Sequence, residues 1–533
     1  MRAALAWAIC LGPAAVGAAE FTHTGHGLKT ADAPFRLTVI SRVRGDGLYN
    51  LDLDRGPTPG GEIFYPVPED PSAQTLWAGD YRLRTDFAAY SPGREIALMM
   101  RFDVGNVNIG GAPNGPSLAA TSDAPVIGLR LRRLYAEVLT PLGLVSVGRG
   151  GAHWGTGMLV NSGDCGECDS GDAADRVAWI VPTLDHIFAL AYDWAWTGPQ
   201  TLHKDEGPLH LDPADAGLGL SFAALNWRPE RAIRRRLRAG KNTVNYGLLV
   251  SYHRQETDVP AEYLPLALAL QGQEKREMHR GLTAWATDGW ARFASPFFRA
   301  QLEAALLQST VDEPSLIPGT SYGVPLTARQ WGLVLETSIG PWQGPYEIGI
   351  DAGYASGDAA YGFGAFPPIL GAPTQRGDLD GPQANPPYDT SVNNFRFHSD
   401  YHVDRILFRE IIGTVTDAMY LRPHGRWRFM RAGDGFLAAE VAGVLSYAVE
   451  PTSAPGQARP LGIEIDPSLR YGSSTFALGI HYAVLVPLGG LDNTAPEMAA
   501  RPAQSIRAQL EVKFGSDTPN NTMATKTPFE TRF

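Results

Sequence analysis

Stretches in which apolar and polar residues alternate recur along most of this chain. Near the start, one set of residues is apolar and the set between them is polar: Phe35, Leu37, Val39 and Val43 against Arg36, Thr38, Arg42 and Arg44. Near the end, the same pattern joins Ile506, Ala508, Leu510 and Val512 with Ser505, Arg507, Gln509 and Glu511. A period of two places the two sets on opposite faces of a β-strand. Many runs reach about ten residues, the length that a tilted strand needs to cross a bilayer.

The connections between these runs alternate between short and long. We expect about 18 strands, within a range of roughly 16–18, since long and short connections alternate in this way in outer-membrane barrels. The long connections are expected at 46–79, 106–127, 150–175, 198–216, 256–279, 310–326 and 358–415. Two of the short turns are expected to be extended, at 229–242 and 423–435. An even strand count places both termini of the chain in the periplasm.

The pattern therefore predicts an all-β protein, a single transmembrane antiparallel β-barrel formed by residues 20–514. In lipid, unpaired strand edges leave backbone groups without hydrogen bonds, so the sheet has to close. Glycine (59 residues) and aromatic residues (10%) are abundant together, in keeping with a β-rich chain. A barrel of this size encloses water, and the mixed charges of the inner faces suit a wet lumen better than a packed core.

The two ends of the chain carry separate predictions. Residues 1–19 have the features of a secretory signal peptide, because Arg2 precedes an apolar run that ends in small residues before Glu20. We therefore expect export to the outer membrane. Phe514 is expected to close the last strand, and residues 515–533 form a C-terminal tail in which Pro528 disfavours a further strand.

Charged residues of the polar faces are the predicted lining of the lumen. They are Arg36, Arg42, Arg82, Asp86, Arg101, Arg299, Glu303, Glu336, Glu347 and Arg507. Charged side chains that line a pore select the solutes that pass. The net charge of −11 argues against a nucleic-acid partner.

Two local departures from the alternation, and one basic run, carry predictions of their own. At Arg132-Arg133 the pattern changes phase, which predicts a β-bulge. Residues 403–412 are apolar at helical spacing, which predicts a short helix inside the lumen or at the barrel rim. The basic run 228–241 is predicted to be periplasmic, either a helical turn that contacts a partner or lipid headgroups, or a solvated charged segment.

The only cysteines outside the leader, Cys165 and Cys168, lie in the third long connection, which we expect outside the cell near the pore mouth. A disulfide is the favoured interpretation on the oxidising side of the membrane. A metal site formed by acids of this segment, for example for Ca²⁺, is the second interpretation, with the candidate ligands Asp164, Glu167, Asp169 and Asp172. A solvated acidic loop is the simplest alternative to the metal site. A redox motif of the thioredoxin type is disfavoured, since no βαβ pattern surrounds the cysteines.

Several motifs surround these cysteines: RLRRLYAEV at 130–138, TPLG at 140–143, HWGTG at 153–157 and DRV at 175–177, with a further segment at 401–423. With them the chain resembles a family of uncharacterised outer-membrane barrel proteins from myxobacteria and related deltaproteobacteria. A looser similarity is to alginate-export-type porins. The resemblance implies a barrel in the outer membrane and no known activity.

These features predict a porin-like channel for the passive passage of small solutes. The alternative is a structural or surface-assembly barrel whose loops bind partners in a motility, secretion or envelope complex. The sequence contains no nucleophile elbow and no convincing Ser/His/carboxylate set, so we expect no enzymatic activity. We expect no cofactor other than the Ca²⁺ considered above. The expected partners are outer-membrane lipid, small solutes and the barrel-assembly machinery.

Overall fold

The computed structural model describes residues 34–59, 61, 74–111, 129–169, 171–184, 186–197, 218–226, 230–258, 278–314, 321–341, 344–365, 374–433, 435–494 and 497–515. The predicted signal peptide at 1–19 and the predicted tail beyond Gly515 lie outside the described residues, and both stay predictions.

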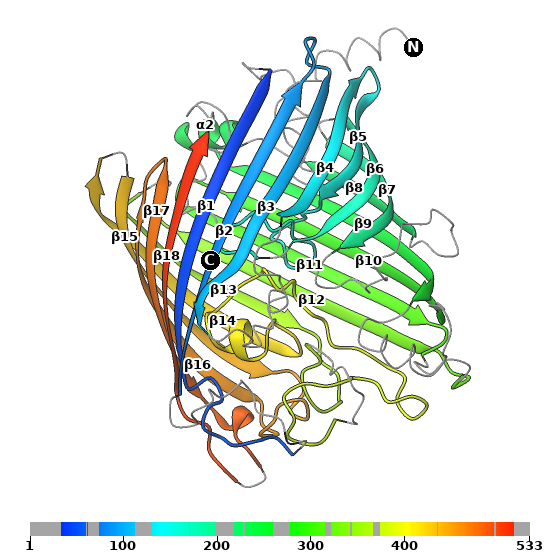
Figure 1. The fold of residues 1–533 in the computed structure, drawn as a ribbon, viewed down its shortest axis with the longest axis vertical. Coiled ribbons are helices and arrows are strands. Elements are labelled where there is room, and N and C mark those ends of the chain that lie inside the picture. The colour runs from blue at the N-terminus through cyan, green and yellow to red at the C-terminus, as the bar shows by residue number, and fades with distance from the viewer. Residues whose placement is uncertain are drawn as a thin grey trace.

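The described residues form one closed antiparallel barrel of 18 strands (Figure 1). Each strand pairs with its neighbours in sequence, and β1 also pairs with β18, from Thr38↔Gly515 to Tyr49↔Gln504. The predicted fold class and strand number are confirmed. The strands are β1 Phe35–Tyr49, β2 Thr75–Tyr90, β3 Ile96–Gly111, β4 Leu129–Thr140, β5 Gly143–Gly151, β6 Ala173–Thr183, β7 His186–Thr197, β8 Leu218–Asn226, β9 Thr243–Asp258, β10 Met278–Ala294, β11 Phe298–Val311, β12 Leu326–Ile339, β13 Tyr346–Ala355, β14 Ala418–Ala432, β15 Gly435–Ala448, β16 Pro460–Gly472, β17 Phe476–Pro487 and β18 Ala503–Gly515.

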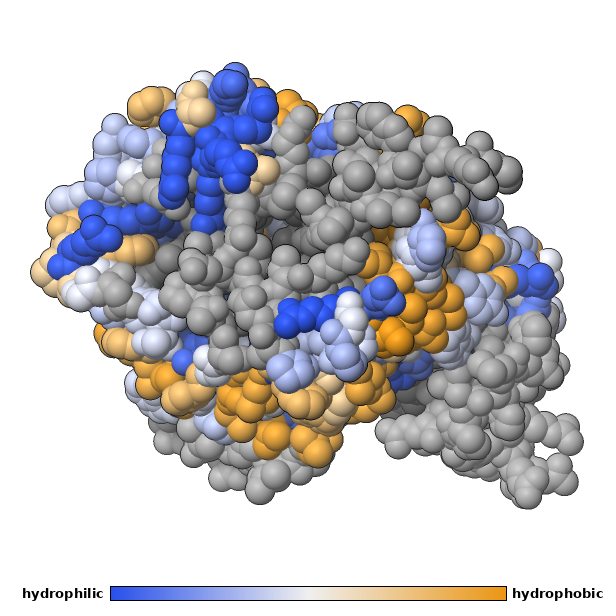
Figure 2. Space-filling model, turned by 90° about the horizontal axis from the view of Figure 1, so that it is seen from above, coloured by the Kyte–Doolittle hydropathy of each residue, from blue (hydrophilic) through white to orange (hydrophobic). Residues whose placement is uncertain are grey.

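The alternation of the sequence separates an apolar outer face from a charged inner face. On β1, Leu37 is 46% exposed, whereas Arg42 is 0% exposed and Arg44 is buried. The same division holds along β12, where Trp331 and Leu333 are exposed. Hydrophobic residues gather on the outer flank of the barrel in Figure 2. Large apolar side chains exposed on consecutive strands form a surface suited to lipid.

The predicted β-bulge is present in β4. Arg101 of β3 pairs with Arg133, while the next residue of β3, Phe102, pairs with Leu131, so Arg132 is the extra residue. Arg133 is buried inside the barrel and Leu131 is exposed outside it. The bulge therefore lets Leu131 face outward and Arg133 face the lumen, although the alternation changes phase between them.

Short and long connections alternate around the barrel, as predicted, but one predicted connection is wrong. Residues 423–432 belong to β14, where Pro423 pairs with Ile350, and the turn lies only between Ala432 and Gly435. Pro423 and Gly425 are residues typical of turns, yet both lie within the strand. Two long connections, at 449–459 and 488–502, were not predicted; the second contains a 3₁₀ turn, η4 Gly489–Leu491.

At the short-turn end of the barrel, the basic run forms a helix, α2 Glu230–Arg238. Its buried residues Ile233 and Leu237 pack with Ala294 at the end of β10. Burial of these apolar residues fixes the helix to the barrel rim, while Arg235 and Arg238 stay exposed. Among the described residues, no helix combines the length and the apolar character needed to span a bilayer.

Within the part of the chain that the structure describes, two long connections fold into the barrel. We name residues 152–169 with 171–172 the disulfide loop, and residues 356–365 with 374–417 the second inserted loop. The disulfide loop was expected near the pore mouth, and this is wrong: it bonds to Arg42 and Arg84, near the middle of their strands. The expectation of a lumen without a packed core also fails in part. An apolar cluster that includes Met158 of one loop and Phe363 and Phe395 of the other lies inside the barrel.

The helix predicted at 403–412 is a single π-helical turn, η3 Leu407–Ile411, within the second inserted loop. Leu407, Phe408 and Ile411 are buried in the apolar cluster. The turn therefore lies inside the barrel, which was one of its two predicted positions, and it narrows the lumen.

Candidate functional site

Arginines of β1 to β4 form a basic wall on one side of the lumen. Arg42 of β1 lies directly across from Arg82 of β2, and Arg101 of β3 lies across from Arg133 of β4. Like charges placed directly opposite one another destabilise a sheet unless other groups compensate them. Each guanidinium group also carries five N–H donors that need acceptors when the group is buried. The basic wall therefore requires acceptors from outside these strand pairs.

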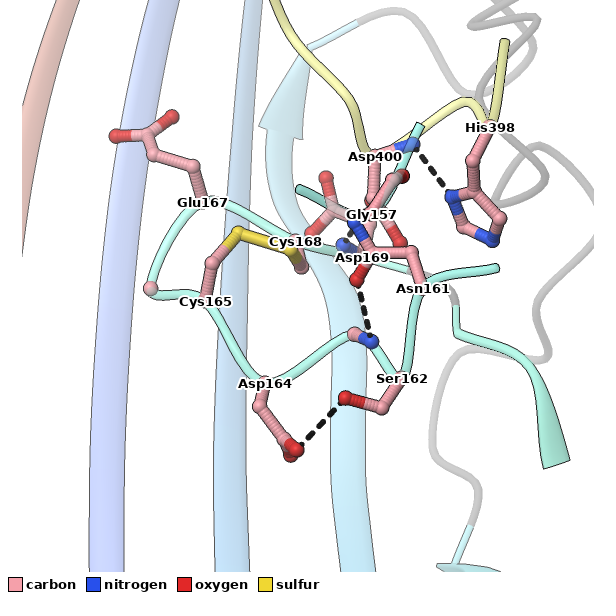
Figure 3. Close-up of a disulfide and its surroundings, with 12 residues drawn as sticks. Gly157, Asn161, Ser162, Asp164, Cys165, Glu167, Cys168, Asp169, His398 and Asp400 are labelled. Atoms are coloured by element: carbon pink, nitrogen blue, oxygen red, sulfur yellow. Dashed lines mark hydrogen bonds between the residues drawn. A yellow bond between two sulfur atoms is a disulfide. The ribbon is translucent and has the colours of Figure 1, made fainter. Parts of the chain in front are cut away.

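The disulfide loop supplies many of those acceptors. Nη1 of Arg42 donates to the carbonyl oxygens of Gly166 (3.0 Å) and Cys168 (3.3 Å), and Arg82 donates to the same Cys168 carbonyl. The Asp169 carboxylate accepts from Arg42 at 2.5 Å and from Arg44 at 2.9 Å. A disulfide joins Cys165 to Cys168 in this turn (Figure 3).

Two further acids of the same turn bind arginines on either side. Asp164 bonds to Arg101, and it accepts from Nη2 of Arg133 at 2.9 Å. Glu167, which points away from Asp169 in Figure 3, accepts from Arg409 at 3.2 Å and from Arg507 at 3.1 Å. We name residues 164–169 the acidic turn; its bonds reach β1, β2, β3, β4 and β18.

Burial and charge compete in setting the protonation of these acids. Burial of Glu167 favours its neutral form, but the guanidinium groups of Arg409 and Arg507 outweigh burial and hold the pKa of this carboxyl well below its usual range. Burial also opposes ionisation of Asp169, and Arg42 and Arg44 outweigh it in the same way, so its pKa is well below the usual value. Both carboxylates are therefore charged at neutral pH and form charge-assisted hydrogen bonds.

The second inserted loop holds the disulfide loop against the basic wall. The amide of Asp169 donates to Asp400 Oδ1 at 2.9 Å, and the amide of His398 donates to the Met158 carbonyl at 2.7 Å. Nδ1 of His398 accepts the amide of Asp400 at 3.0 Å, and its Nε2 lies 3.4 Å from Asp172 Oδ2. Contacts along residues 398–400 thus position both ends of the segment 158–172.

Strands β16 and β17, which adjoin β18, hold the second inserted loop. The Glu464 carboxylate of β16 accepts three backbone N–H groups, from Arg405 (2.8 Å), Ile406 (2.9 Å) and Leu407 (3.1 Å). The Arg405 guanidinium also bonds to Nδ1 of His481 at 2.7 Å. The second inserted loop is therefore fixed to β16 and β17 on one side and to the disulfide loop on the other.

The residues predicted to line the lumen lie on the strand faces opposite the exposed apolar residues, and several contact an inserted loop. Arg42, Arg82, Arg101 and Arg507 bind the acidic turn, as described above. Glu303 accepts from the Thr156 hydroxyl at 2.7 Å, and Glu336 accepts from the Tyr401 hydroxyl at 2.6 Å. The remaining four make bonds within the wall: Arg36 to Tyr90, Asp86 to Arg101, and Arg299 and Glu347 to each other.

The four predicted metal ligands have partners within the protein. Asp164, Glu167 and Asp169 bind the arginines already named, and Asp172 accepts the amide of Asn161 at 3.0 Å beside His398. In the part of the chain that the structure describes, no three His, Cys, Asp or Glu side chains are grouped as a metal site would require. Guanidinium groups therefore neutralise the acidic turn here, and the Ca²⁺ interpretation stays a prediction.

Several residues of the site were not predicted. Asp400 and Arg409 act through contacts with residues more than 200 positions away, such as the bond between Asp169 and Asp400. No local pattern reveals such contacts. Arg44 and Arg84, in contrast, lie on the same polar faces as the predicted residues of β1 and β2, so the alternation alone could have identified them.

Solved structures include barrels that the chain resembles. One is the outer membrane protein OpdK from Pseudomonas aeruginosa, with 8% identity over 90% of this chain and 99% of that chain and a TM-score of 0.45. Another is OccK9 (OpdG) from the same organism, with 11% identity, 90% and 98% coverage and a TM-score of 0.46. A BenF-like porin from Pseudomonas fluorescens Pf-5 matches with 6% identity, 90% and 99% coverage and a TM-score of 0.45.

No family model and no curated protein matches the chain. Membership of the uncharacterised barrel family, and the looser similarity to alginate-export-type porins, therefore stay predictions. The solved structures are too distant in sequence to assign a solute. The function proposed below rests on the residues of this chain.

Proposed function

We propose that this chain is an outer-membrane channel for the passive passage of small solutes, with the two inserted loops setting the width of the path. The observation that carries the proposal is the division of side chains between the faces of one closed barrel. Exposed residues such as Leu37 and Trp331 suit lipid, while buried charged residues such as Arg42 and Glu336 face the lumen. Charges that face inward in a barrel of this size favour a water-filled path.

The proposed orientation follows from the lengths of the connections. In outer-membrane barrels with an even number of strands, the short turns and both chain termini face the periplasm, and the long loops face outward. The disulfide loop and the second inserted loop then enter the lumen from the outer side. A solute from outside meets the two loops before it reaches α2 at the periplasmic end.

Selectivity in this proposal comes from the basic wall and from the acidic turn that covers it. A passing solute has to move along charged groups that already bond to each other, such as Arg42 with Asp169. A polar solute can replace its lost hydrogen bonds to water by hydrogen bonds to these groups, which an apolar solute cannot do. We therefore expect low conductance with a preference among ions.

Single-channel recording in planar bilayers tests the proposal. The full chain, folded in detergent, is expected to insert and give discrete conductance steps, with ion preference measured by reversal potentials in a salt gradient. Heat-modifiable gel mobility shows that the sample is folded. Folded protein that inserts into vesicles but gives no conductance, and no uptake of small sugars, would contradict the channel and favour the surface-assembly alternative.

A further inference from the structure

The Cys165–Cys168 disulfide encloses the part of the loop that covers the basic wall. Gly166 and Glu167 lie inside the disulfide ring, and Asp169 follows it directly. We propose that this disulfide is a reducible latch: reaction with a small thiol frees the acidic turn from the basic wall and widens the lumen. The inference rests on the proposed channel function and names a way in which the same site is regulated.

The acidic turn has little backbone structure of its own to replace the disulfide. Within the described residues of the turn, a backbone hydrogen bond runs from the amide of Cys168 to the carbonyl of Cys165, at 3.3 Å. The loop on either side is held by shorter bonds: the amide of Asp172 donates to the Asn161 carbonyl at 2.7 Å, and that of Ala152 to the Asp172 carbonyl at 3.0 Å. Loss of the disulfide should therefore loosen the turn and leave the base of the loop in place.

The docked position of the acidic turn depends on the disulfide ring, because the turn makes contacts on two sides. Arg42 bonds to the carbonyls of Gly166 and Cys168 on one side, while Glu167 reaches Arg409 and Arg507 on the other. Only a tight turn presents both sets of acceptors at once. A reduced turn gains backbone freedom, which costs about 1–2 kcal/mol per residue to fix again.

The basic wall, in contrast, keeps acidic partners of its own. Asp80 stays bonded to Arg42 (3.1 Å) and Arg44 (2.6 Å), and Asp103 stays bonded to Arg84 at 2.9 Å. The wall can therefore remain in place when the turn leaves. The space vacated by the turn would then be lined by arginines with fewer carboxylates near them, which favours anions.

The two cysteine residues differ in exposure. Cys165 is partly exposed, whereas Cys168 is 1% exposed. A thiolate from solution therefore attacks Sγ of Cys165, forms a mixed disulfide and displaces Cys168 as a thiolate. Arg42 and Arg82, which bond to the carbonyl of Cys168, provide positive charge near this leaving group.

A second thiolate completes the reduction. It attacks the sulfur of the small thiol in the mixed disulfide and displaces Cys165 as a thiolate. Each cysteine then takes one of the two protons that the small thiols released. Two small thiols are thus oxidised to one small disulfide, and the protein disulfide is reduced to two thiols.

The experiment uses the full chain, folded in detergent, with reduced glutathione as the thiol. Alkylation and mass measurement count the freed cysteines, and unboiled gel mobility reports the fold. Hydrogen exchange then compares residues 161–169 with the strands. We expect alkylation of both Cys165 and Cys168, unchanged mobility, and faster exchange confined to the acidic turn.

Conductance gives the functional readout. Reduction should raise single-channel conductance by about twofold or more and shift the reversal potential toward anions, because the carboxylates leave a basic lumen. The double variant Cys165→Ser with Cys168→Ser should behave like the reduced protein without glutathione, and glutathione should not change it. This variant also serves as the control for effects of glutathione elsewhere.

The outcomes separate the latch from the channel. Unchanged exchange of residues 161–169 after complete reduction would overturn the latch, and so would equal conductance of oxidised and reduced channels. Cysteines that stay unreactive in folded protein would overturn it as well. If the turn loosens on reduction but neither form conducts, the reducible turn stands and the channel function fails.

Discussion

Glu167 is a residue on which several charges of the candidate site converge. It comes from the disulfide loop, Arg409 from the second inserted loop and Arg507 from β18, so one carboxylate joins three separate parts of the chain. Removing one partner of a buried ion pair usually costs about 3–5 kcal/mol, because the other charge is left unpaired. The acidic turn should therefore be sensitive to neutral substitutions at this position.

We expect Glu167→Gln to loosen the acidic turn, because it leaves Arg409 and Arg507 without the charge that they share. Hydrogen exchange of residues 161–169 should become faster, and single-channel conductance should rise. Asp175→Asn is the matched control, since its partner Arg149 is partly exposed and lies outside the turn. Equal exchange in the two variants would show that Glu167 does not hold the turn.

The lowered pKa values of Glu167 and Asp169 predict that the acidic turn resists mild acid. Because both pKa values are lower in the folded protein, the stabilisation is fully present above the usual carboxyl pKa of about 4 and is lost only as the pH falls through the lowered values. Protection of residues 161–169, corrected for the intrinsic exchange rate, should therefore be the same at neutral pH as near pH 5, and should fall only at lower pH. Marked loss of protection already near pH 5 would show that protonation of other groups, and not of these two carboxyls, releases the turn.

Among the elements, the strands follow local patterns and the inserted loops do not. The bulge at Arg132 could be predicted because two neighbouring arginines break a period of two. The position of the disulfide loop could not, since it depends on Asp169 meeting Asp400, which follows it by 231 residues. Because a proline is uncommon inside a strand, Pro423 favoured the wrong prediction of a turn where β14 continues.

Glu464 supports a whole element, because it accepts three backbone N–H groups at the start of η3. Glu464→Leu should leave these buried donors without an acceptor, at about 1–3 kcal/mol each. We expect the second inserted loop to detach, with faster exchange at residues 398–412 and higher conductance. Glu464→Gln keeps an acceptor oxygen and should retain most of the protection. Similar exchange in both variants would argue against this role.

For the barrel as a whole, the outer face predicts how the protein sits in lipid. Val43 lies midway along β1 on this face and is exposed. Val43→Arg should destabilise the barrel by about 2–4 kcal/mol, the usual cost of an arginine near the bilayer midplane. Denaturant titrations of protein folded in vesicles measure the change, with Val43→Leu as the control. Equal stability of the two variants would place Val43 away from lipid.

The acidic turn also crosses the line where the last strand meets the first. Asp169 binds Arg42 and Arg44 on β1, and Glu167 binds Arg507 on β18. Its full set of partners exists only after synthesis of the whole chain and pairing of its two terminal strands. The Cys165–Cys168 ring, by contrast, needs only a few neighbouring residues. The ring can thus form before the barrel closes, and docking of the turn would then mark a barrel whose assembly is complete.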